Sequence, residues 1–388
     1  MKKLLFVNGH LNIGGVEKSL VDLLKNIDLE LFEVDLVLFE EIGDYADEVP
    51  NDVNIIFYDL TRTYGSFKHC MLQGITARDW FSVWLRMIFL LSKKIKARLF
   101  TLAKPLFKPN KRYDCAIAYR VGICTDFVGY IVNSKKKVSW WHHGEYDLND
   151  KMTKRLSETY KKFDSIVAVS DSSKKLLNKS VPGIYKKLVT IPNIVDCDEI
   201  IKKAHENYDY GTSNSGHITL LSMGRLSPEK GMINCVHACK KLIDSGYKVK
   251  WYLIGEGVQR SEIEECISDY NLHNDIYLLG SQKNPYPYLK GADIFVHPSY
   301  VESLSLTVLE AFALNTPVVA VRSMGPMEYI RDKENGLLVE ATPDGLCEGI
   351  INLITDKNLY NRLKEDKSDD LRYYRPESVI KKVYVLFS

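Results

Sequence analysis

The chain alternates short apolar runs with longer amphipathic stretches over most of its 388 residues. Runs that are apolar on both faces are typical of buried parallel strands, and the amphipathic stretches between them predict covering helices. The runs fall into two series. The first covers residues 4–8, 34–39, 53–58, 115–119, 137–141, 165–170 and 188–191, and the second covers 218–223, 249–254, 276–279, 294–297 and 317–320. The sequence therefore predicts an α/β fold with two parallel sheets.

The alternating pattern stops over residues 197–216, which predict a linker. We expect an N-terminal domain over residues 1–196 and a C-terminal domain over 217–372. A last amphipathic helix over 374–388 needs an apolar surface to cover. Two such domains facing each other form an interdomain cleft, and ligands of parallel sheets bind beyond the carboxyl ends of the strands.

Composition narrows the class of protein. With 45% apolar and 26% charged residues, the chain resembles ordinary globular proteins, and its net charge of +2 disfavours a dispersed nucleic-acid-binding surface. The eight cysteines show no C-x-x-C pair and no zinc-ligand spacing, so we interpret them as reduced thiols of a cytosolic protein. The first apolar run is too short for a signal peptide, and no run approaches the ~18 apolar residues of a membrane span. We expect a cytoplasmic protein whose contact with a membrane, if any, is peripheral.

Two glycines follow the first predicted strand. Gly14 and Gly15 stand where a helix begins, and their lack of side chains lets backbone N–H groups approach a phosphate or a sugar. The G-x-G-x-x-G spacing is absent, which disfavours a nicotinamide enzyme. A helix-entry turn that needs glycine only for its geometry is the alternative interpretation.

Two histidines follow the strand predicted at 137–141. Because successive side chains of a strand point to opposite faces, His142 and His143 cannot both face one site. His142, directly at the strand end, is the candidate for the cleft. The alternative is a pair of surface or packing histidines.

The second domain carries two candidate cations. Arg225 and Lys230 lie five residues apart on the loop between the strand at 218–223 and the following helix. Two cations beside a helix N-terminus suit the binding of a diphosphate. Solvated surface charges are the alternative.

Two carboxylates flank a later helix start. Glu302 and Glu310 lie eight residues apart, on either side of a start near Ser305, and free N–H groups are expected at Ser305, Leu306 and Thr307. Two carboxylates could hold both sugars of a nucleotide-sugar while the backbone donors hold its phosphate. Either glutamate alone would be interpreted as a solvated acid.

In this order, the residues resemble the family 4 retaining glycosyltransferases, which have two facing Rossmann-like domains in the GT-B arrangement. The resemblance covers nearly the whole chain. The motifs that carry it are Gly14-Gly15-Val16-Glu17, His142, Val169-Ser170, Pro192-Asn193-Ile194-Val195-Asp196, Gly224-Arg225-Leu226, Glu229-Lys230-Gly231, Ile254-Gly255-Glu256-Gly257, Leu279-Gly280, Asn284-Pro285-Tyr286, His297-Pro298-Ser299, Glu302 with Glu310, Pro317-Val318-Val319-Ala320, Gly325-Pro326 with Glu328, and Asn335-Gly336-Leu337-Leu338-Val339.

The resemblance implies transfer of a sugar from a nucleotide-sugar, with retention of anomeric configuration and without a bound metal or other cofactor. It also implies a helix at 374–388 that crosses back onto the first domain. The resemblance also implies which residues contact which part of the donor. Arg225, Lys230 and the backbone of Ser305, Leu306 and Thr307 would bind the diphosphate, with Gly14 and Gly15 at the underside of the phosphate. Glu310 would bind the nucleotide ribose, Gln282 and Asn284 would lie near the nucleobase, Glu302 would bind hydroxyls of the transferred sugar, and His142 would lie near the anomeric carbon.

One departure from the family concerns the segment after Glu302. The usual Gly-Phe-Gly is Ser303-Leu304-Ser305 here. Serine tolerates a positive φ less easily than glycine, so we expect the donor geometry, and with it the sugar preference, to be affected.

Residues 78–112 form a basic segment with ten Lys or Arg and one acidic residue, a local net charge of +9 that leaves −7 for the rest. Its apolar residues fall at helical steps, as in helices that bind at a membrane interface. We therefore expect contact with an anionic membrane surface. A helix that packs its apolar stripe on the N-terminal sheet is the alternative.

The resulting hypothesis is a cytosolic glycosyltransferase, with a UDP-linked donor, that adds a sugar to a glycan or lipid-linked glycan in bacterial surface polysaccharide synthesis. Two alternatives stay open: a non-catalytic GT-B subunit that binds a partner, and a GT-B epimerase that acts on a nucleotide-sugar without an acceptor.

Overall fold

The structure, a computed structural model, describes residues 1–40, 43–58, 84, 87, 101, 111–144, 150–206 and 216–387. The chain divides into two compact units, each described by itself below. The first unit comprises Met1–Ile194 and Val379–Ser388, and the second comprises Val195–Ser378.

The first unit is built on a parallel sheet whose described strands have the order β3-β2-β1-β4-β5-β6-β7. The strands are β1 (Lys2–Val7), β2 (Phe32–Leu38), β3 (Asn54–Phe57), β4 (Tyr113–Ala118), β5 (Ser134–Trp141), β6 (Ser165–Ala168) and β7 (Leu188–Thr190). The helices are α1 (Gly15–Asn26), α5 (Ile123–Tyr130), α6 (Asp150–Tyr160), α7 (Asp171–Ser180) and, at the end of the chain, α16 (Pro376–Phe387).

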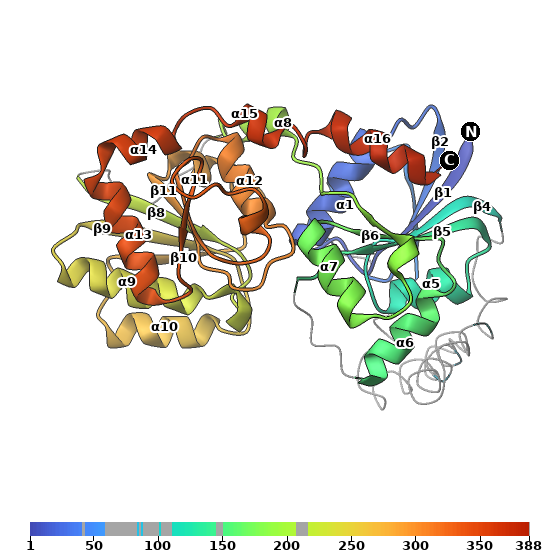
Figure 1. The fold of residues 1–388 in the computed structure, drawn as a ribbon, viewed down its shortest axis with the longest axis horizontal. Helices are drawn as coiled ribbons and strands as arrows, with labels where there is room; N and C mark the ends of the chain where they lie inside the picture. The colour runs from blue at the N-terminus through green and yellow to red at the C-terminus, as the bar shows by residue number, and fades with distance from the viewer. Residues whose placement is uncertain are drawn as a thin grey trace. The chain divides into compact units, whose positions relative to one another are not determined.

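Helices cover both faces of this sheet because its strands are apolar on both sides (Figure 1). Leu5 of β1 shares a core cluster with Phe127 of α5 and Tyr160 of α6. Phe6, whose side chain points to the opposite face, packs edge-on against Phe387 of α16, with ring centroids 6.2 Å apart. The last helix of the chain is therefore part of the core of the first unit.

The second unit has a parallel sheet with the order β10-β9-β8-β11-β12-β13. The strands are β8 (Ile218–Met223), β9 (Val249–Ile254), β10 (Ile276–Gly280), β11 (Ile294–His297), β12 (Val318–Val321) and β13 (Leu337–Val339). The helices are α8 (Cys197–Lys203), α9 (Met232–Asp244), α10 (Arg260–Asp269), α11 (Tyr286–Gly291), α12 (Leu306–Ala313), α13 (Pro343–Thr355), α14 (Lys357–Leu363) and α15 (Ser368–Leu371).

Two groups of helices enclose this sheet. Residues of α9, α10 and α13 share a core cluster with Leu220 of β8 and Trp251 of β9. Helices α8, α11 and α12 contact one another and complete the unit. The two parallel sheets with covering helices agree with the fold expected from the alternating pattern.

The expected linker at 197–216 differs from the structure in its first part, where Cys197–Lys203 forms α8 inside the second unit. The carboxylate of Asp196 caps this helix by accepting a hydrogen bond from the N–H of Glu199 at 3.0 Å. Acidic residues in the first turn and Lys202 and Lys203 in the last turn suit the helix dipole. The interpretation as a linker was wrong there because it followed the loss of apolar periodicity and overlooked these capping signals.

Three other expectations bear on the described residues. The seven cysteines other than Cys70 are free thiols, five of them buried, and Cys70 lies outside the described residues. None of the helices in the described ranges is long and apolar enough to cross a membrane. The basic segment at 78–112 lies outside the described residues except for Trp84, Met87, Thr101, Lys111 and Arg112.

Candidate functional site

The strand order of each sheet marks where a ligand is expected. In the first sheet, β1 lies between β2 and β4, so the chain first adds strands on one side of β1 and later adds strands on its other side. In the second sheet, β8 lies between β9 and β11 in the same way. In open parallel sheets, ligands bind beyond the carboxyl ends of the strands at such a switch point. The loops after β8 and β11 contain Arg225, Lys230 and Glu302, so the sequence-predicted charges of the second unit lie at its switch point.

The loops after β8 and β11 are held together by backbone contacts. The carbonyl of Glu229 accepts hydrogen bonds from the N–H of Tyr300 and from the hydroxyl of Ser299, both at 3.2 Å. Gly231 has φ +65°, and a Cβ atom there would lie 2.4 Å from the carbonyl oxygen of Pro298. Glycine is therefore required both for the turn and for the close approach of the two loops.

Lys230 and Glu302 form an ion pair across these loops. The Nζ atom of Lys230 lies 2.6 Å from Oε1 of Glu302, and the two side chains are 25% and 10% exposed. The ring of His297, the last residue of β11, approaches the same carboxylate, with Nε2 3.3 Å from Oε1. Burial acts to raise the pKa of Glu302, but the charge of Lys230 and the hydrogen bond with His297 outweigh it and hold that pKa well below its usual range.

The turn before α12 contains the serine that replaces the family's glycine. Ser305 is the N-cap of α12 and has φ +66° and ψ 80°, in the left-handed region. The hydroxyl of Tyr329 donates to the carbonyls of Leu304 and Ser305, at 2.9 and 3.1 Å, which holds the strained turn. Within the described residues, the backbone N–H groups of Ser305, Leu306 and Thr307 donate no backbone hydrogen bond, as expected for the first turn of a helix.

The second carboxylate lies inside α12. Glu310 is 9% exposed, and one of its oxygens accepts a hydrogen bond from the hydroxyl of Tyr286 at 2.9 Å. Arg225, by contrast, is exposed, so its guanidinium faces solvent. The structure thus brings Lys230, Glu302 and Ser305 together at the switch point, with Glu310 one helical turn further along α12.

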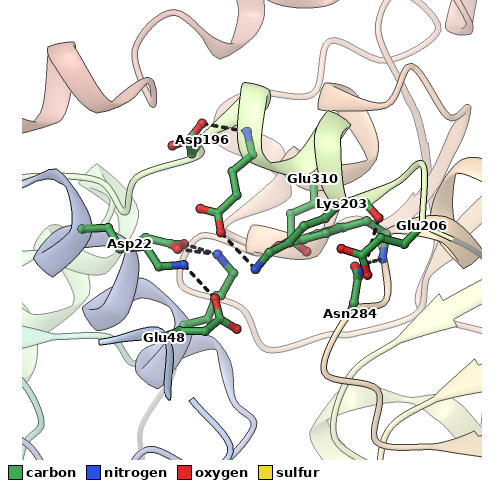
Figure 2. A network of polar contacts seen from close by, with 11 residues as sticks. Asp22, Glu48, Asp196, Lys203, Glu206, Asn284 and Glu310 are labelled. Carbon is green, nitrogen blue, oxygen red and sulfur yellow. Dashed lines mark hydrogen bonds and ion pairs between the residues drawn. The ribbon is translucent and has the colours of Figure 1, made fainter. Parts of the chain in front are cut away.

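The two residues expected near the nucleobase have partners within the second unit. The side-chain amide of Asn284 donates to the carbonyl of Lys203 at 3.0 Å and to the carboxylate of Glu206 at 2.8 Å (Figure 2). Gln282 donates to the carbonyl of Leu279 at 2.8 Å. Asn284 therefore ties the segment after β10 to the end of α8, a role that sequence reasoning missed because it interpreted α8 as linker.

In the first unit, His142 follows β5 and packs on Tyr119, with ring centroids 4.8 Å apart, whereas His143 packs on Trp141. Burial, with smaller contributions from the charges of His143 and Arg120, lowers the pKa of His142 to about 3. The imidazole is neutral at physiological pH, so it can take part in hydrogen bonds but supplies no positive charge.

Gly14 and Gly15 differ in what their backbones permit. Gly15 begins α1, and a Cβ atom there would meet nothing within 4 Å. A Cβ atom on Gly14 would lie 2.5 Å from Oε2 of Glu17. A side chain at position 14 would therefore require the carboxylate of Glu17 to shift.

Glu17 belongs to a polar cluster that sequence reasoning did not assign. Arg120, which follows β4, donates to Glu17 at 2.8 Å and lies 2.7 Å from Nε2 of His10, which is in the loop after β1. These loops leave adjacent strands at the switch point of the first unit. The available signal was the position of Arg120 directly after a buried strand.

Comparisons with known proteins agree with the fold and the motifs. Residues 207–369 match the family described as glycosyl transferases group 1. An uncharacterized glycosyltransferase of Methanocaldococcus jannaschii is 30% identical over 174 residues, which are 44% of this chain and 43% of that protein. The chain thus spans less than half the length of this relative.

Two further likenesses extend over the whole chain. An N-acetylgalactosamine-N,N'-diacetylbacillosaminyl-diphospho-undecaprenol 4-alpha-N-acetylgalactosaminyltransferase of Campylobacter jejuni is 27% identical over 94% of this chain and 93% of its own length. The crystal structure of Anabaena HepE in complex with UDP and glucose has a TM-score of 0.73 and 17% identity, and covers 99% of each chain. Structural likeness at that identity identifies only the fold, which is that of the GT-B glycosyltransferases.

Proposed function

We propose that this chain, a member of the glycosyltransferases with the GT-B fold and similarity to family 4, is an enzyme that transfers a hexose-type sugar from a nucleotide-sugar to a glycan in polysaccharide or glycolipid synthesis. The observation that carries the proposal is the cluster of Lys230, Glu302 and the first turn of α12 at the switch point of the second unit. This unit would bind the donor, and the first unit would carry the acceptor-side residues.

The chemistry of donor binding supports this assignment. Departure of a nucleoside diphosphate requires stabilisation of the negative charge that grows on its phosphate. Arg225, Lys230 and the N–H groups at the start of α12 supply positive charge and donors there. We propose that these groups act without a bound metal, and measuring transfer in the presence of a chelator tests that part.

Two carboxylates would orient the sugars. Glu310, held by Tyr286, would accept from the ribose hydroxyls, and Glu302, kept ionised by Lys230 and His297, would accept from hydroxyls of the transferred sugar. The family resemblance supports retention of configuration, and it is also the support for assigning the neutral His142 to the surroundings of the anomeric carbon. In a same-face substitution, the bond from the anomeric carbon to the diphosphate breaks as the acceptor oxygen attacks, and the departing phosphate takes the acceptor's proton.

We also propose a UDP-linked donor and a lipid-linked acceptor. The solved structure of HepE contains UDP and glucose, which supports the first. The name of the Campylobacter relative specifies a diphospho-undecaprenol-linked acceptor, which supports the second.

Replacing Glu310 by glutamine tests the site and the function together. Titrating UDP-, GDP- and ADP-sugars against the wild type by thermal shift identifies the donor. We expect Glu310→Gln to bind this donor about 10- to 100-fold more weakly, because a charged acceptor of two hydroxyls is lost. The matched control is Glu340→Gln, an exposed glutamate of the same unit. Binding of no nucleotide-sugar by the wild type would favour a non-catalytic subunit, and conversion of the donor without an acceptor would favour an epimerase.

The proposed site of action is the inner face of the cell membrane, with residues 78–112 as the contact. The net charge of +9 in this segment supports attraction to anionic lipid. In a vesicle flotation experiment, we expect the chain to bind phosphatidylglycerol vesicles at low salt and to be released from them at high salt. We expect no binding to phosphatidylcholine vesicles. Absence of binding to the anionic vesicles at low salt contradicts this part of the proposal and leaves the donor site unaffected.

A further inference from the structure

The imidazole of His297 and the hydroxyl group of Ser305 lie beside Glu302, and the role of the hydroxyl group has not been assigned above. His297 is 3% exposed and Ser305 is 7% exposed. Nε2 of His297 lies 3.3 Å from Oε1 of Glu302 and 3.1 Å from Oγ of Ser305. The imidazole therefore stands between the carboxylate and the hydroxyl.

The environment of the imidazole indicates which nitrogen carries the proton. Nδ1 of His297 is buried and has no hydrogen-bond partner among the described residues. A proton on Nδ1 would leave a buried donor unsatisfied, whereas a proton on Nε2 faces both the Glu302 carboxylate and the Ser305 oxygen. We assign the proton to Nε2, so His297 donates toward Glu302.

Ser305 is placed at a cost in backbone energy. Serine rarely adopts φ +66°, a conformation that glycine takes without strain. A strained backbone conformation of this kind persists where the surrounding structure holds it. Here the hydroxyl of Tyr329 holds the turn through its hydrogen bonds to the carbonyls of Leu304 and Ser305. What serine provides and glycine cannot is the hydroxyl beside His297.

We propose that His297 and the Ser305 hydroxyl position Glu302 to bind a hydroxyl group of the transferred sugar, and that they thereby contribute to the choice of sugar. With Nε2–H directed at Glu302 and Ser305 Oγ, the hydroxyl hydrogen of Ser305 stays available to an outside acceptor, such as a sugar oxygen. The inference rests on the proposed function, because it assigns a role within the donor site. His297 acts through Glu302 and is a positioning residue.

The test separates binding of the sugar from binding of the nucleotide. Calorimetric titrations of the wild type and the variants use two bare nucleotides, UDP and GDP. They also use four nucleotide-sugars: UDP-glucose, UDP-galactose, UDP-N-acetylglucosamine and GDP-mannose. Ser305→Ala removes the hydroxyl and keeps a strained residue, whereas Ser305→Gly removes both the hydroxyl and the strain. Asn271→Gly is the matched control, because Asn271 is an exposed residue with φ +55° on another loop of the same unit.

The sugar's contribution is the ratio of the affinity for the nucleotide-sugar to the affinity for the bare nucleotide. We expect this ratio to fall about three- to tenfold in both Ser305 variants, while the affinity for the bare nucleotide stays within about twofold of the wild type. His297→Leu should lose about tenfold or more, and His297→Gln, which keeps an N–H near the position of Nε2, should recover most of it. Asn271→Gly should bind like the wild type.

Three results would overturn the inference. The first is an unchanged sugar contribution in both Ser305 variants. The second is a loss in Ser305→Ala alone, which would assign the effect to backbone strain. The third is an equal loss for nucleotide and nucleotide-sugar, which would indicate a general structural effect. A wild type that binds none of the six compounds overturns the proposed function as well, so the two failures are distinguishable.

Discussion

Replacing Lys230 by alanine is expected to lower the rate of sugar transfer by about 10²–10³-fold, because the cation that we propose for the leaving diphosphate is lost. The same change should destabilise the second unit by about 3 kcal/mol, because it leaves the carboxylate of Glu302, which is 10% exposed, without its lysine partner. Steady-state kinetics, with the donor that thermal shift identifies, measure the effect on the rate. Urea unfolding, followed by circular dichroism, measures the effect on stability.

The destabilisation should depend on pH. In the wild type, the pKa of Glu302 is depressed in the folded state, so the ion pair stabilises the fold above the pKa of the unfolded chain, about 4.3 for glutamate. That contribution fades as the pH falls below this value toward the folded-state pKa. The difference in unfolding free energy between wild type and variant should therefore be largest near pH 7 and shrink below about pH 4.

A double variant separates the two roles of Lys230. Lys230→Met with Glu302→Gln removes both charges and leaves no buried ion unpaired, so its stability should return to within about 1 kcal/mol of the wild type. Its rate of transfer should stay low, because neither charged group is present. If the double variant is as unstable as Lys230→Ala, the ion pair is not the source of the lost stability.

Replacing Gly255 by alanine is expected to destabilise the second unit by about 3–5 kcal/mol, through overpacking and a strained backbone. Gly255 follows β9 with φ +145°, and a Cβ atom there would lie 1.9 Å from the carbonyl oxygen of Gly224, in the loop after β8. The two glycines directly follow the last paired residues of β8 and β9, Met223 and Ile254, so the contact cannot be relieved without disturbing the end of the sheet. Urea unfolding of the purified variant measures the effect.

Gly246 provides the matched control for this substitution. It also has a positive φ, +85°, but a Cβ atom there would meet nothing within 4 Å. Gly246→Ala should therefore cost only the backbone strain, about 1 kcal/mol. Equal losses in the two variants would show that the contact with Gly224 does not matter.

The strands of the second unit illustrate what the sequence could predict. Runs at 218–223, 249–254 and 294–297 coincide with β8, β9 and β11, because a buried parallel strand is apolar on both faces and bounded by turn residues. Strand β13 (Leu337–Val339) was not among the predicted strands, although it has the same length as β7, which the run at 188–191 predicted. The departure from the family motif drew attention to Ser305 but did not establish its backbone conformation, which the structure shows to have φ +66°.

Side-chain pairing could not be predicted in the same way. Arg120 and Glu17 lie 103 positions apart in the sequence, and Lys230 and Glu302 lie 72 apart. Their pairing depends on which strands are neighbours and on the rotamers that packing permits. The hydrogen bond from Asn284 to Lys203 belongs to the same class, because it joins two segments that lie 81 positions apart in the sequence.

The place of α16 in the first unit has a consequence for synthesis of the chain. Phe6 of β1 and Phe32 of β2 both pack against Phe387, so the apolar surface on this face of the first sheet is covered by the last turns of the chain. During translation, the first unit emerges early but lacks residues 379–388 until the whole second unit has been made. The core of the first unit is therefore completed only after every residue of the second unit has been synthesised, which departs from the usual order in which the N-terminal domain folds first.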